Sequence, residues 1–370
     1  MEQMKITHIL FSGLGGHSSV VFSCIKADLE HEFKHSLIFY GIESILQSHI
    51  DNSEELKIPY LNIKKRKGLD LVSWWRVFQE LRRKKPEVIL LHSISLIIPT
   101  WIYAKVYRKK IIGIEHTSIV VKRRVENISS YIAGILSDKV VLLSRESKRD
   151  YLKNYKLNIG HKLRIIPNGI ETAIFNKIHQ NQERDYIHLT MISRFSIQKD
   201  HKTLIMAMKQ VDGAKLTIAG NGATWNEINE FIRKNELEDK VDLCGLLNEK
   251  QIIELFRNTD IYVHASFGET LPTSILQAMS CELPVIGSNI AGINNLIEHK
   301  KSGLLYENKN VSQLAQKINY LIEHKEIRDS MGQNARKKIE KNYSNLRMFD
   351  QYKRLIASTL KKSSKRKKKR

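Results

Sequence analysis

Short runs of apolar, often β-branched residues alternate with amphipathic stretches along almost the whole chain. The first half carries six such runs, at residues 6–11, 36–40, 88–91, 111–115, 140–143 and 163–166. The second half carries five, at residues 187–192, 215–219, 241–243, 261–264 and 284–286. Because the runs are continuously apolar, they are typical of parallel strands buried on both faces. The pattern predicts an α/β fold of two Rossmann-like, doubly wound domains.

A polar break at residues 179–185 separates the two sets of strands. We therefore expect a first domain over residues 1–170 and a second over residues 171–345. A helix over residues 346–360 is expected to return to the first domain. The last ten residues, KKSSKRKKKR, are too densely charged to fold alone and are expected to form a disordered tail.

The charge of the chain is strongly basic and unevenly spread. The sequence has 61 Lys and Arg against 39 Asp and Glu, a net charge of +22. Residues 1–170 carry 28 basic and 16 acidic side chains, whereas residues 171–360 carry 25 and 23. Basic clusters stand at residues 64–67, 82–85, 108–110 and 122–124. An anionic partner is therefore expected at the first domain or the tail.

Two anionic partners fit this charge, a membrane leaflet and a nucleic acid. Ordinary solvated helix ends would also explain any single cluster. A nucleic-acid partner is disfavoured, because the sequence shows neither a helix-turn-helix nor basic residues interleaved with aromatic ones.

Amino-acid composition indicates the kind of cellular compartment in which the chain folds. Hydrophobic residues make up 42% of the chain, as in a globular protein. Three widely spaced cysteines argue against a disulfide framework and favour a reducing cytosol. No secretory signal is visible, and no apolar stretch is long enough to cross a bilayer.

A glycine-rich turn follows the first strand. Gly15 and Gly16 open a helix whose N-terminal amides could meet an anion. The dinucleotide-binding fingerprint is incomplete, because its third glycine is replaced by Ser18. A simple tight turn explains the same residues equally well.

The second domain has candidate ligand-binding residues after three of its strands. Arg194 and Lys199 follow the first strand, where a guanidinium and an ammonium suit a diphosphate. Gly220 and Gly222 form a close-approach turn after the next strand. Two surface cations and an ordinary turn are the alternative interpretation.

A third group follows the strand at residues 261–264. Glu269 is placed to bind sugar hydroxyls, and a helix beginning near Pro272 offers its amides to a phosphate. The group comprises Glu269, Thr270, Leu271, Pro272, Thr273 and Gln277. A carboxylate that merely caps the helix is the alternative. In the first domain, His116 ends the strand at residues 111–115, at the functional edge of such a sheet.

Taken together, these segments resemble the retaining glycosyltransferase family 4, which has the GT-B fold of two Rossmann-like domains facing across a cleft. The resemblance runs from about residue 6 to about residue 352. The matching positions are Gly15-Gly16, His116, Pro167-Asn168-Gly169-Ile170, the pair Arg194 and Lys199, Gly220 and Gly222, and the E-x7-E motif that starts at Glu269. Gln277 replaces the second glutamate of that motif, which in the family holds the ribose of the nucleotide.

The resemblance implies transfer of a sugar from a nucleotide-diphosphate donor, with UDP favoured, and retention at the anomeric carbon. Arg194 and Lys199 would stabilise the leaving diphosphate, while Glu269 and His116 would position the sugar. Asn168 joins the donor-binding residues. No metal is expected, because the chain has no Asp-x-Asp motif, and no other cofactor is implied.

The implied acceptor is lipid-linked or a polysaccharide precursor, as in bacterial capsule or exopolysaccharide assembly. The protein would then be cytoplasmic and peripheral on the inner face of the cell membrane. Two alternatives stay open: a soluble GT-B transferase with a small acceptor, and a non-catalytic paralogue, which Gln277 suggests.

Overall fold

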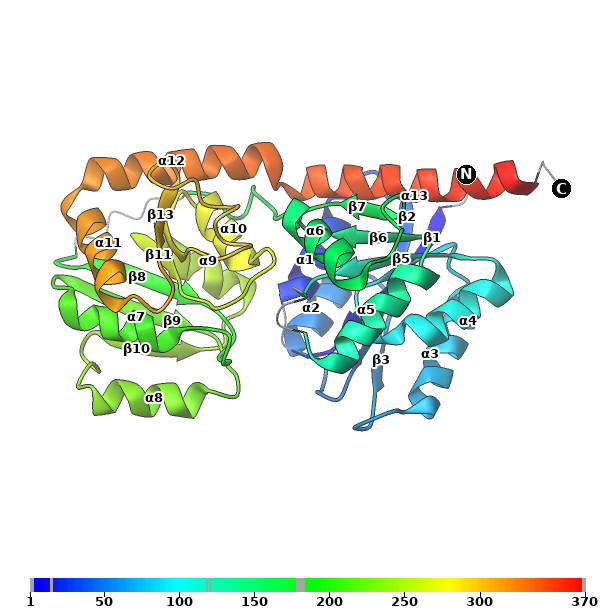
Figure 1. The fold of residues 1–370 in the computed structure, drawn as a ribbon, viewed down its shortest axis with the longest axis horizontal. Helices are drawn as coiled ribbons and strands as arrows, with labels where there is room; N and C mark the ends of the chain where they lie inside the picture. Colours follow the sequence, from blue (N-terminus) through cyan, green and yellow to red (C-terminus); the bar gives the residue numbers. More distant parts are fainter. Residues whose placement is uncertain (1–2, 14–15, 118, 120–121, 178–183, 368–370) are drawn as a thin grey trace. The chain divides into compact units, whose positions relative to one another are not determined.

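The computed structural model describes residues 3–13, 16–117, 119, 122–177 and 184–367. It divides into two compact units. Unit 1 comprises Met1–Gly169 and Asn345–Arg370, and unit 2 comprises Ile170–Ser344. Each is built on one parallel sheet (Figure 1).

Unit 1 has a seven-stranded sheet in the order β3-β2-β1-β4-β5-β6-β7. The strands are β1 (Met4–Phe11), β2 (Phe33–Gly41), β3 (Tyr60–Lys64), β4 (Val88–Leu91), β5 (Lys110–Glu115), β6 (Lys139–Leu142) and β7 (Leu163–Ile165). The strand order reverses between β1 and β4, as in doubly wound folds.

Helices cover both faces of this sheet. They are α1 (Gly16–Lys26), α2 (Gln47–Glu55), α3 (Leu71–Lys84), α4 (Ile97–Tyr107), α5 (Arg124–Leu136), α6 (Arg145–Tyr155) and α13 (Asn345–Lys367), with a short η1 (Ile94–Leu96) before α4. On β4, Val88 and Leu90 pack in the core with α1 and α13, while Ile89 and Leu91 pack with α3 and α4. Both faces of the strand are therefore buried, which explains its uninterrupted apolar sequence.

Unit 2 has a six-stranded parallel sheet in the order β10-β9-β8-β11-β12-β13. Its strands are β8 (Ile187–Ile192), β9 (Ala214–Ala219), β10 (Val241–Gly245), β11 (Ile261–His264), β12 (Val285–Ser288) and β13 (Gly303–Tyr306). Its helices are α7 (His201–Ala207), η3 (Met208–Gln210), α8 (Trp225–Lys234), α9 (Glu249–Arg257), α10 (Thr273–Ser280), α11 (Val311–Glu323) and α12 (Lys325–Asn342). The carboxyl ends of β8, β9 and β11 carry the loops that hold most of the candidate residues.

The C-terminal helix α13 belongs to unit 1. Met348, Phe349, Tyr352 and Ile356 pack in the same core as β1 and α1. At the start of the helix, Asn345 Nδ2 donates a hydrogen bond of 3.1 Å to the Ser23 carbonyl. The chain therefore leaves unit 1, builds unit 2 and returns to complete the first core.

Two strands of the structure lie outside the predicted set, and both are sheet edges. β3 alternates buried and solvated positions, and β13 is a four-residue strand that starts with glycine. Neither has the continuous apolar run by which buried parallel strands are recognised.

The end of the chain differs from the expectation of a disordered tail after residue 360. Helix α13 continues to Lys367, through most of the expected tail. Extending an existing helix adds a hydrogen bond for each residue fixed, without a new nucleation cost. Among the described residues, no helix combines the length and the apolar character needed to cross a membrane.

Candidate functional site

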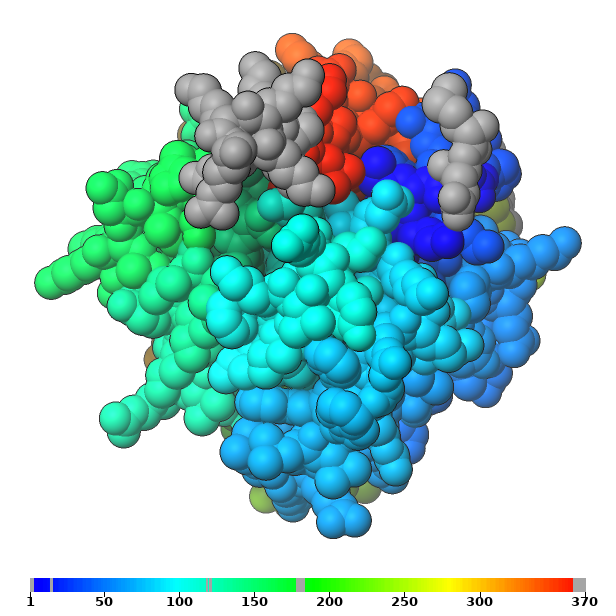
Figure 2. Space-filling model, turned by 90° about the vertical axis from the view of Figure 1, so that its right-hand side faces the viewer, coloured from blue at the N-terminus to red at the C-terminus, as the bar shows by residue number. Residues whose placement is uncertain are grey.

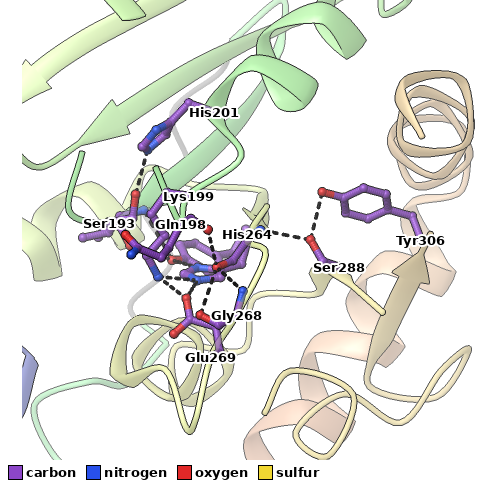
Figure 3. Close-up of polar contacts among 12 residues, drawn as sticks. Ser193, Gln198, Lys199, His201, His264, Gly268, Glu269, Ser288 and Tyr306 are labelled. Carbon is purple, nitrogen blue, oxygen red and sulfur yellow. Dashed lines mark hydrogen bonds and ion pairs between the residues drawn. The ribbon is translucent and has the colours of Figure 1, made fainter. Parts of the chain in front are cut away.

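In unit 2, the loops after β8 and β11 bring a lysine and a glutamate to the histidine that ends β11 (Figure 3). Lys199 Nζ forms an ion pair with Glu269 Oε1. His264 Nε2 lies 2.9 Å from the same carboxylate oxygen and 3.5 Å from Lys199 Nζ. The side chains of Lys199 and Glu269 are 15% and 13% exposed, so the pair is shielded but still reachable. We call these three residues the Lys199–Glu269–His264 cluster.

A buried tyrosine, Tyr262, contacts the histidine of the cluster. Tyr262 Oη lies 3.1 Å from His264 Nδ1 and donates to the Ile192 carbonyl at 3.2 Å. The tyrosine is fully buried between β11 and β8. It ties the imidazole of His264 to the end of β8, which fixes the ring toward Glu269.

Electrostatics keep the carboxylate charged. Burial raises the pKa of Glu269, but Lys199 and His264 outweigh that effect and lower it to about 2. Burial, with the nearby Lys199 charge, lowers the pKa of His264 despite Glu269. At neutral pH the cluster presents an ionised carboxylate, a hydrogen-bond acceptor of the kind sugar hydroxyls require.

Backbone pairing holds the two loops together. Lys199 and Ser266 form an antiparallel bridge. The Phe267 amide donates to the Gln198 carbonyl at 2.8 Å, and Ser266 Oγ donates to the same carbonyl at 3.0 Å. The Ser266 amide donates in turn to Ser288 Oγ on β12 at 3.0 Å. The cluster is therefore fixed to the sheet and does not rest on side-chain contacts alone.

The two glycines after β9 support the loop that carries Arg194. A Cβ at Gly220 would lie 1.8 Å from the Ser193 carbonyl oxygen, and one at Gly222 would lie 2.2 Å from the Phe195 carbonyl oxygen. Both have positive φ, at 138° and 155°. The sequence suggested that these glycines admit a ligand. The structure shows that they admit the neighbouring backbone, on either side of Arg194.

The other predicted residues of unit 2 lie close in sequence to Lys199 and Glu269. Arg194 is exposed and forms no ion pair among the described side chains. Pro272 is the N-cap residue of α10, one position before the helix, and Thr273 begins it. Of the predicted residues on this segment, the buried ones are Thr270, Leu271, Pro272 and Gln277. The first amides of α10 lack helical partners, as at any helix N-terminus.

The predicted residues of unit 1 come from three segments, two of which meet, because the ring of His17, next to Gly16 on α1, lies 5.5 Å from that of His116. His116 directly follows β5, Gly16 begins α1, and Asn168 is buried at the end of the unit. Gly15 lies outside the described residues. The relation of these residues to the cluster in unit 2 stays a prediction.

The basic cluster at residues 122–124 is only partly solvated. Lys122 is buried and forms an ion pair with Glu115, each side chain being 4% exposed. It also donates to Ser130 Oγ at 2.6 Å. A buried carboxylate at the end of β5 requires a compensating charge, and Lys122 provides it. Arg123 and Arg124 are exposed.

Sequence reasoning missed several polar side chains that the sheets place near these residues. His264 and Tyr262 in unit 2 lie within a run read only as a strand. In unit 1, His8, His35 and His92 join His116 in a line of ring contacts. A polar residue inside an apolar strand was the available signal. No group of three or more His, Cys, Asp or Glu in the described part of the chain is arranged to hold a metal ion.

Two models of known protein families together match most of the chain. The model "Glycosyltransferase Family 4" matches residues 14–174, and the model "Glycosyl transferases group 1" matches residues 173–338. The fold resembles the crystal structure of Anabaena Alr3699/HepE in complex with UDP and glucose. That similarity has a TM-score of 0.83 at 18% identity and covers 96% of this chain and 100% of the other.

Two curated relatives have named activities. The alpha-monoglucosyldiacylglycerol synthase of Streptococcus pneumoniae is 30% identical over 192 residues, 47% of this chain and 43% of the relative. The N-acetyl-alpha-D-glucosaminyl L-malate synthase of Bacillus anthracis is 25% identical over 179 residues, 48% of this chain and 46% of the relative. Each match thus spans somewhat under half the length of the relative. Family models, fold and relatives agree: the chain belongs to the family 4 glycosyltransferases of GT-B fold.

Proposed function

We propose that this glycosyltransferase moves a sugar from a UDP-sugar, with retention at the anomeric carbon, to a lipid-linked or polysaccharide-precursor acceptor. The observation that carries the proposal is the Lys199–Glu269–His264 cluster at the carboxyl end of the sheet of unit 2. It combines a cation for a diphosphate with an ionised acceptor for sugar hydroxyls. The structural neighbour that holds UDP and glucose supports the choice of donor.

The cations of unit 2 would act on the leaving group. Negative charge develops on the diphosphate as the sugar leaves, and charges that are already in place stabilise it without reorganisation. Arg194 is exposed and able to swing onto a phosphate, while Lys199 is held by Glu269. A bound diphosphate would compete with Glu269 for Lys199. The carboxylate of Glu269 would then have lone pairs available to accept hydrogen bonds from the sugar.

These cations lead us to propose metal-independent transfer. Arg194, Lys199 and the N-terminus of α10 would supply the positive charge that a divalent ion supplies in other transferases. Turnover in excess EDTA should then equal turnover without it. Loss of turnover in EDTA, restored by one divalent cation, would contradict this part of the proposal.

Retention is proposed on the same site. Glu269 is engaged by Lys199 and His264, so we assign it to hold sugar hydroxyls and not to attack the anomeric carbon. The names of both curated relatives specify an alpha sugar. An alpha-linked product formed from an alpha-linked donor is the outcome that defines retention. A beta-linked product would overturn the assignment.

We propose that the lipid-linked acceptor reaches unit 1 from an anionic membrane surface at the cytoplasmic face of the cell membrane. Helices α3, α4 and α5 lie side by side, and each exposes large apolar side chains. The most exposed are Leu71, Val72, Trp75, Val106, Val125 and Ile128, which we call the α3–α5 face. Figure 2 shows the side of unit 1 on which α3, in light blue, and α4, in cyan, lie.

Basic residues border the α3–α5 face. Those exposed at the helix ends include Arg82, Arg108, Arg123 and Arg124. Aromatic and aliphatic side chains with a basic border suit an anionic lipid surface, where each basic residue contributes about 1 kcal/mol. Of the two adjacent tryptophans on α3, Trp74 packs on the core and Trp75 is 59% exposed.

A second candidate function is transfer to a small soluble acceptor. The Bacillus anthracis relative, whose name specifies L-malate, favours it. The basic excess of unit 1 would then attract a small anion instead of a membrane.

One assay separates the two. In both arms the full chain is incubated with labelled UDP-glucose. The first arm contains anionic vesicles with diacylglycerol and a polyprenyl-diphosphate sugar. The second arm contains soluble hydroxy acids and sugar phosphates. Label in the lipid phase supports the proposed acceptor class, and label in a soluble product supports the second candidate.

Vesicle flotation tests the membrane surface without turnover. Wild type should float with anionic vesicles and not with neutral ones, and Trp75→Ser should weaken flotation. Leu246→Ser, at a residue 52% exposed on unit 2, is the matched control and should leave flotation unchanged. Equal flotation of Trp75→Ser and wild type would remove the α3–α5 face from the proposal.

A further inference from the structure

Four histidines of unit 1 form a continuous chain of ring hydrogen bonds that ends on a carboxylate. His116 Nε2 lies 2.9 Å from His92 Nδ1, and His92 Nε2 lies 3.3 Å from His8 Nδ1. His8 Nε2 lies 3.1 Å from His35 Nδ1, and His35 Nε2 lies 3.3 Å from Asp28 Oδ2. We call this the histidine chain.

The sheet arranges the chain in one diagonal line. His8 shares its face of β1 with Ile6 and Leu10, which pack against α1, because alternate residues of a strand share a face. His35 pairs with Ile6 near the start of β2, whereas His92 and His116 follow the ends of β4 and β5. The chain therefore runs from Asp28, near the amino ends of the strands, to the carboxyl edge.

Each ring of the chain uses both nitrogens in a fixed order. A neutral imidazole has one N–H donor and one acceptor nitrogen. Four neutral rings joined head to tail therefore have two self-consistent settings, in which all the hydrogen bonds point either toward Asp28 or away from it. Nothing within the rings chooses between these settings.

Asp28 makes the choice. An ionised carboxylate only accepts hydrogen bonds, so His35 Nε2 must donate to it. The same carboxylate accepts the Glu32 amide at 2.9 Å and the Phe33 amide at 3.0 Å, which fixes it in place. With His35 Nε2 as a donor, every later ring is set as well, and His116 donates through Nε2 and keeps the lone pair on Nδ1.

We propose that Asp28, acting through His35, His8 and His92, fixes the tautomer of His116 so that its Nδ1 is a hydrogen-bond acceptor for a hydroxyl group of the bound substrate. Asp28 is thus a positioning residue for His116. The inference deepens the proposed function and rests on it for the role of His116 in transfer. The tautomer itself is a property of the chain and can be measured without turnover.

The charges around the histidine chain agree with neutral rings. Burial lowers the pKa of His8 and of His92 well below the usual value. Burial, followed by the charge of Lys122, lowers the pKa of His116 to about 4. Burial raises the pKa of Asp28, but the hydrogen bonds it accepts outweigh burial and lower it overall.

The other titratable groups facing the chain come from three elements. His17 on α1 lies beside His92 and His116, Cys24 on α1 lies beside Asp28, and Lys122 lies beside His116 and is paired with Glu115. A single proton added to the chain has its charge compensated where His35 meets Asp28. That proton would reverse the three hydrogen bonds between the rings, while His35 Nε2 would still donate to Asp28, so His116 would then carry its hydrogen on Nδ1.

The direct test is the protonation of the ring nitrogens in ¹⁵N-histidine-labelled wild type, read by long-range ¹H–¹⁵N NMR at about pH 8, well above the ordinary histidine pKa. The resonances of His116 are assigned by their loss in His116→Asn. The proposal expects hydrogen on Nε2 of His116 and none on Nδ1. Hydrogen on Nδ1 of the wild-type ring would overturn the proposal without any further variant.

Asp28→Asn gives a sharper test, because an amide can both accept and donate. Its oxygen can keep the Glu32 amide, which Asp28 Oδ1 accepts, while its nitrogen, in the place of Oδ2, gives up the Phe33 amide and donates to His35 Nε2. All four rings should then reverse, and His116 should show hydrogen on Nδ1. His8→Phe interrupts the chain at its centre and should give His116 a mixture of tautomers. His49→Phe, at a buried histidine of unit 1 outside the chain, should leave His116 unchanged.

Kinetics provide the functional readout. In Asp28→Asn, kcat should fall by about tenfold, as for the loss of one hydrogen bond to the substrate, with the affinity for UDP unchanged. Folded Asp28→Asn with hydrogen still on Nε2 of His116 would contradict the proposal. Failure of the proposed function would appear differently, as absence of UDP binding in a protein whose His116 still carries the Nε2 hydrogen.

Discussion

At the scale of single residues, the Lys199–Glu269 pair joins stability to function. Glu269 is ionised in a largely buried place because Lys199 and His264 are beside it, and its pKa falls from an ordinary 4.5 to about 2. A carboxyl whose pKa is lowered by folding stabilises the protein above its unfolded pKa. That stabilisation is lost as the pH falls through the folded pKa.

Glu269→Gln should therefore be less stable than wild type at neutral pH, by on the order of 3 kcal/mol, with the difference shrinking as the pH falls from about 4.5 to about 2. Urea unfolding at a series of pH values measures it. Glu230→Gln, which breaks an exposed pair with Lys234, is the control and should show little change at any pH. A difference that is constant with pH would contradict the account of the pair.

Gln277 is the second residue-scale departure. A glutamine oxygen can accept a ribose hydroxyl, but without the strength that a charge gives the bond. We expect Gln277→Glu to bind UDP about fivefold more tightly, equivalent to roughly 1 kcal/mol. Calorimetric titration measures this, beside Gln210→Glu on the surface as control. Weaker binding by Gln277→Glu would show that the nucleotide does not meet this side chain.

At the scale of elements, the turn after β9 holds the loop after β8 by backbone contact. Gly222 has a φ of 155° and leaves no room for a Cβ against the Phe195 carbonyl. Gly213 also has a positive φ, of 63°, but open space around it. The two glycines thus separate the cost of backbone conformation from the cost of displacing the Arg194 loop.

Gly222→Ala should lower both stability, by about 1–3 kcal/mol, and the affinity for UDP. Gly213→Ala should cost stability alone, because its turn is remote from the loop that carries Arg194. Thermal unfolding and UDP titration of both variants make the comparison. Equal UDP affinities in the two variants would mean that the β9 turn does not position Arg194.

At the scale of the whole molecule, the last helix completes the first core. Tyr352 of α13 is buried with the residues of β1 and α1, while Leu346 on the same helix is 54% exposed. We expect Tyr352→Ala to destabilise unit 1 by about 3–5 kcal/mol and Leu346→Ala to change it little. Hydrogen exchange should rise in β1 and α1 and stay unchanged in unit 2. Increased exchange confined to unit 2 would contradict this division.

The interior of both sheets was predictable because buried parallel strands carry continuous apolar runs, as β4 and β11 do. The edge strands β3 and β13 were not predicted. β3 has a solvated face and β13 is short, so neither has a continuous apolar run. In the site, Lys199 and Glu269 each follow a strand of the predicted parallel sheet, and the structure brings these two side chains together, while their role in transfer stays a prediction. The partners His264 and Tyr262 were missed, since only the sheet brings the end of β11 beside the end of β8. Likewise, the histidine chain joins four separate segments, and no local pattern reveals it.

The measurement that tests the central claim most directly is calorimetric titration of the full chain with UDP, alongside GDP and ADP. Wild type should bind UDP saturably. Arg194→Ala/Lys199→Ala should lose about 10²-fold in affinity, because two charge-assisted contacts disappear, each worth roughly 1.5 kcal/mol. Lys202→Ala, which breaks an exposed pair with Glu227, should bind as wild type does. Folded wild type that binds none of the three nucleotides, or a double variant that binds UDP as tightly as wild type, would contradict a donor site at the Lys199–Glu269–His264 cluster.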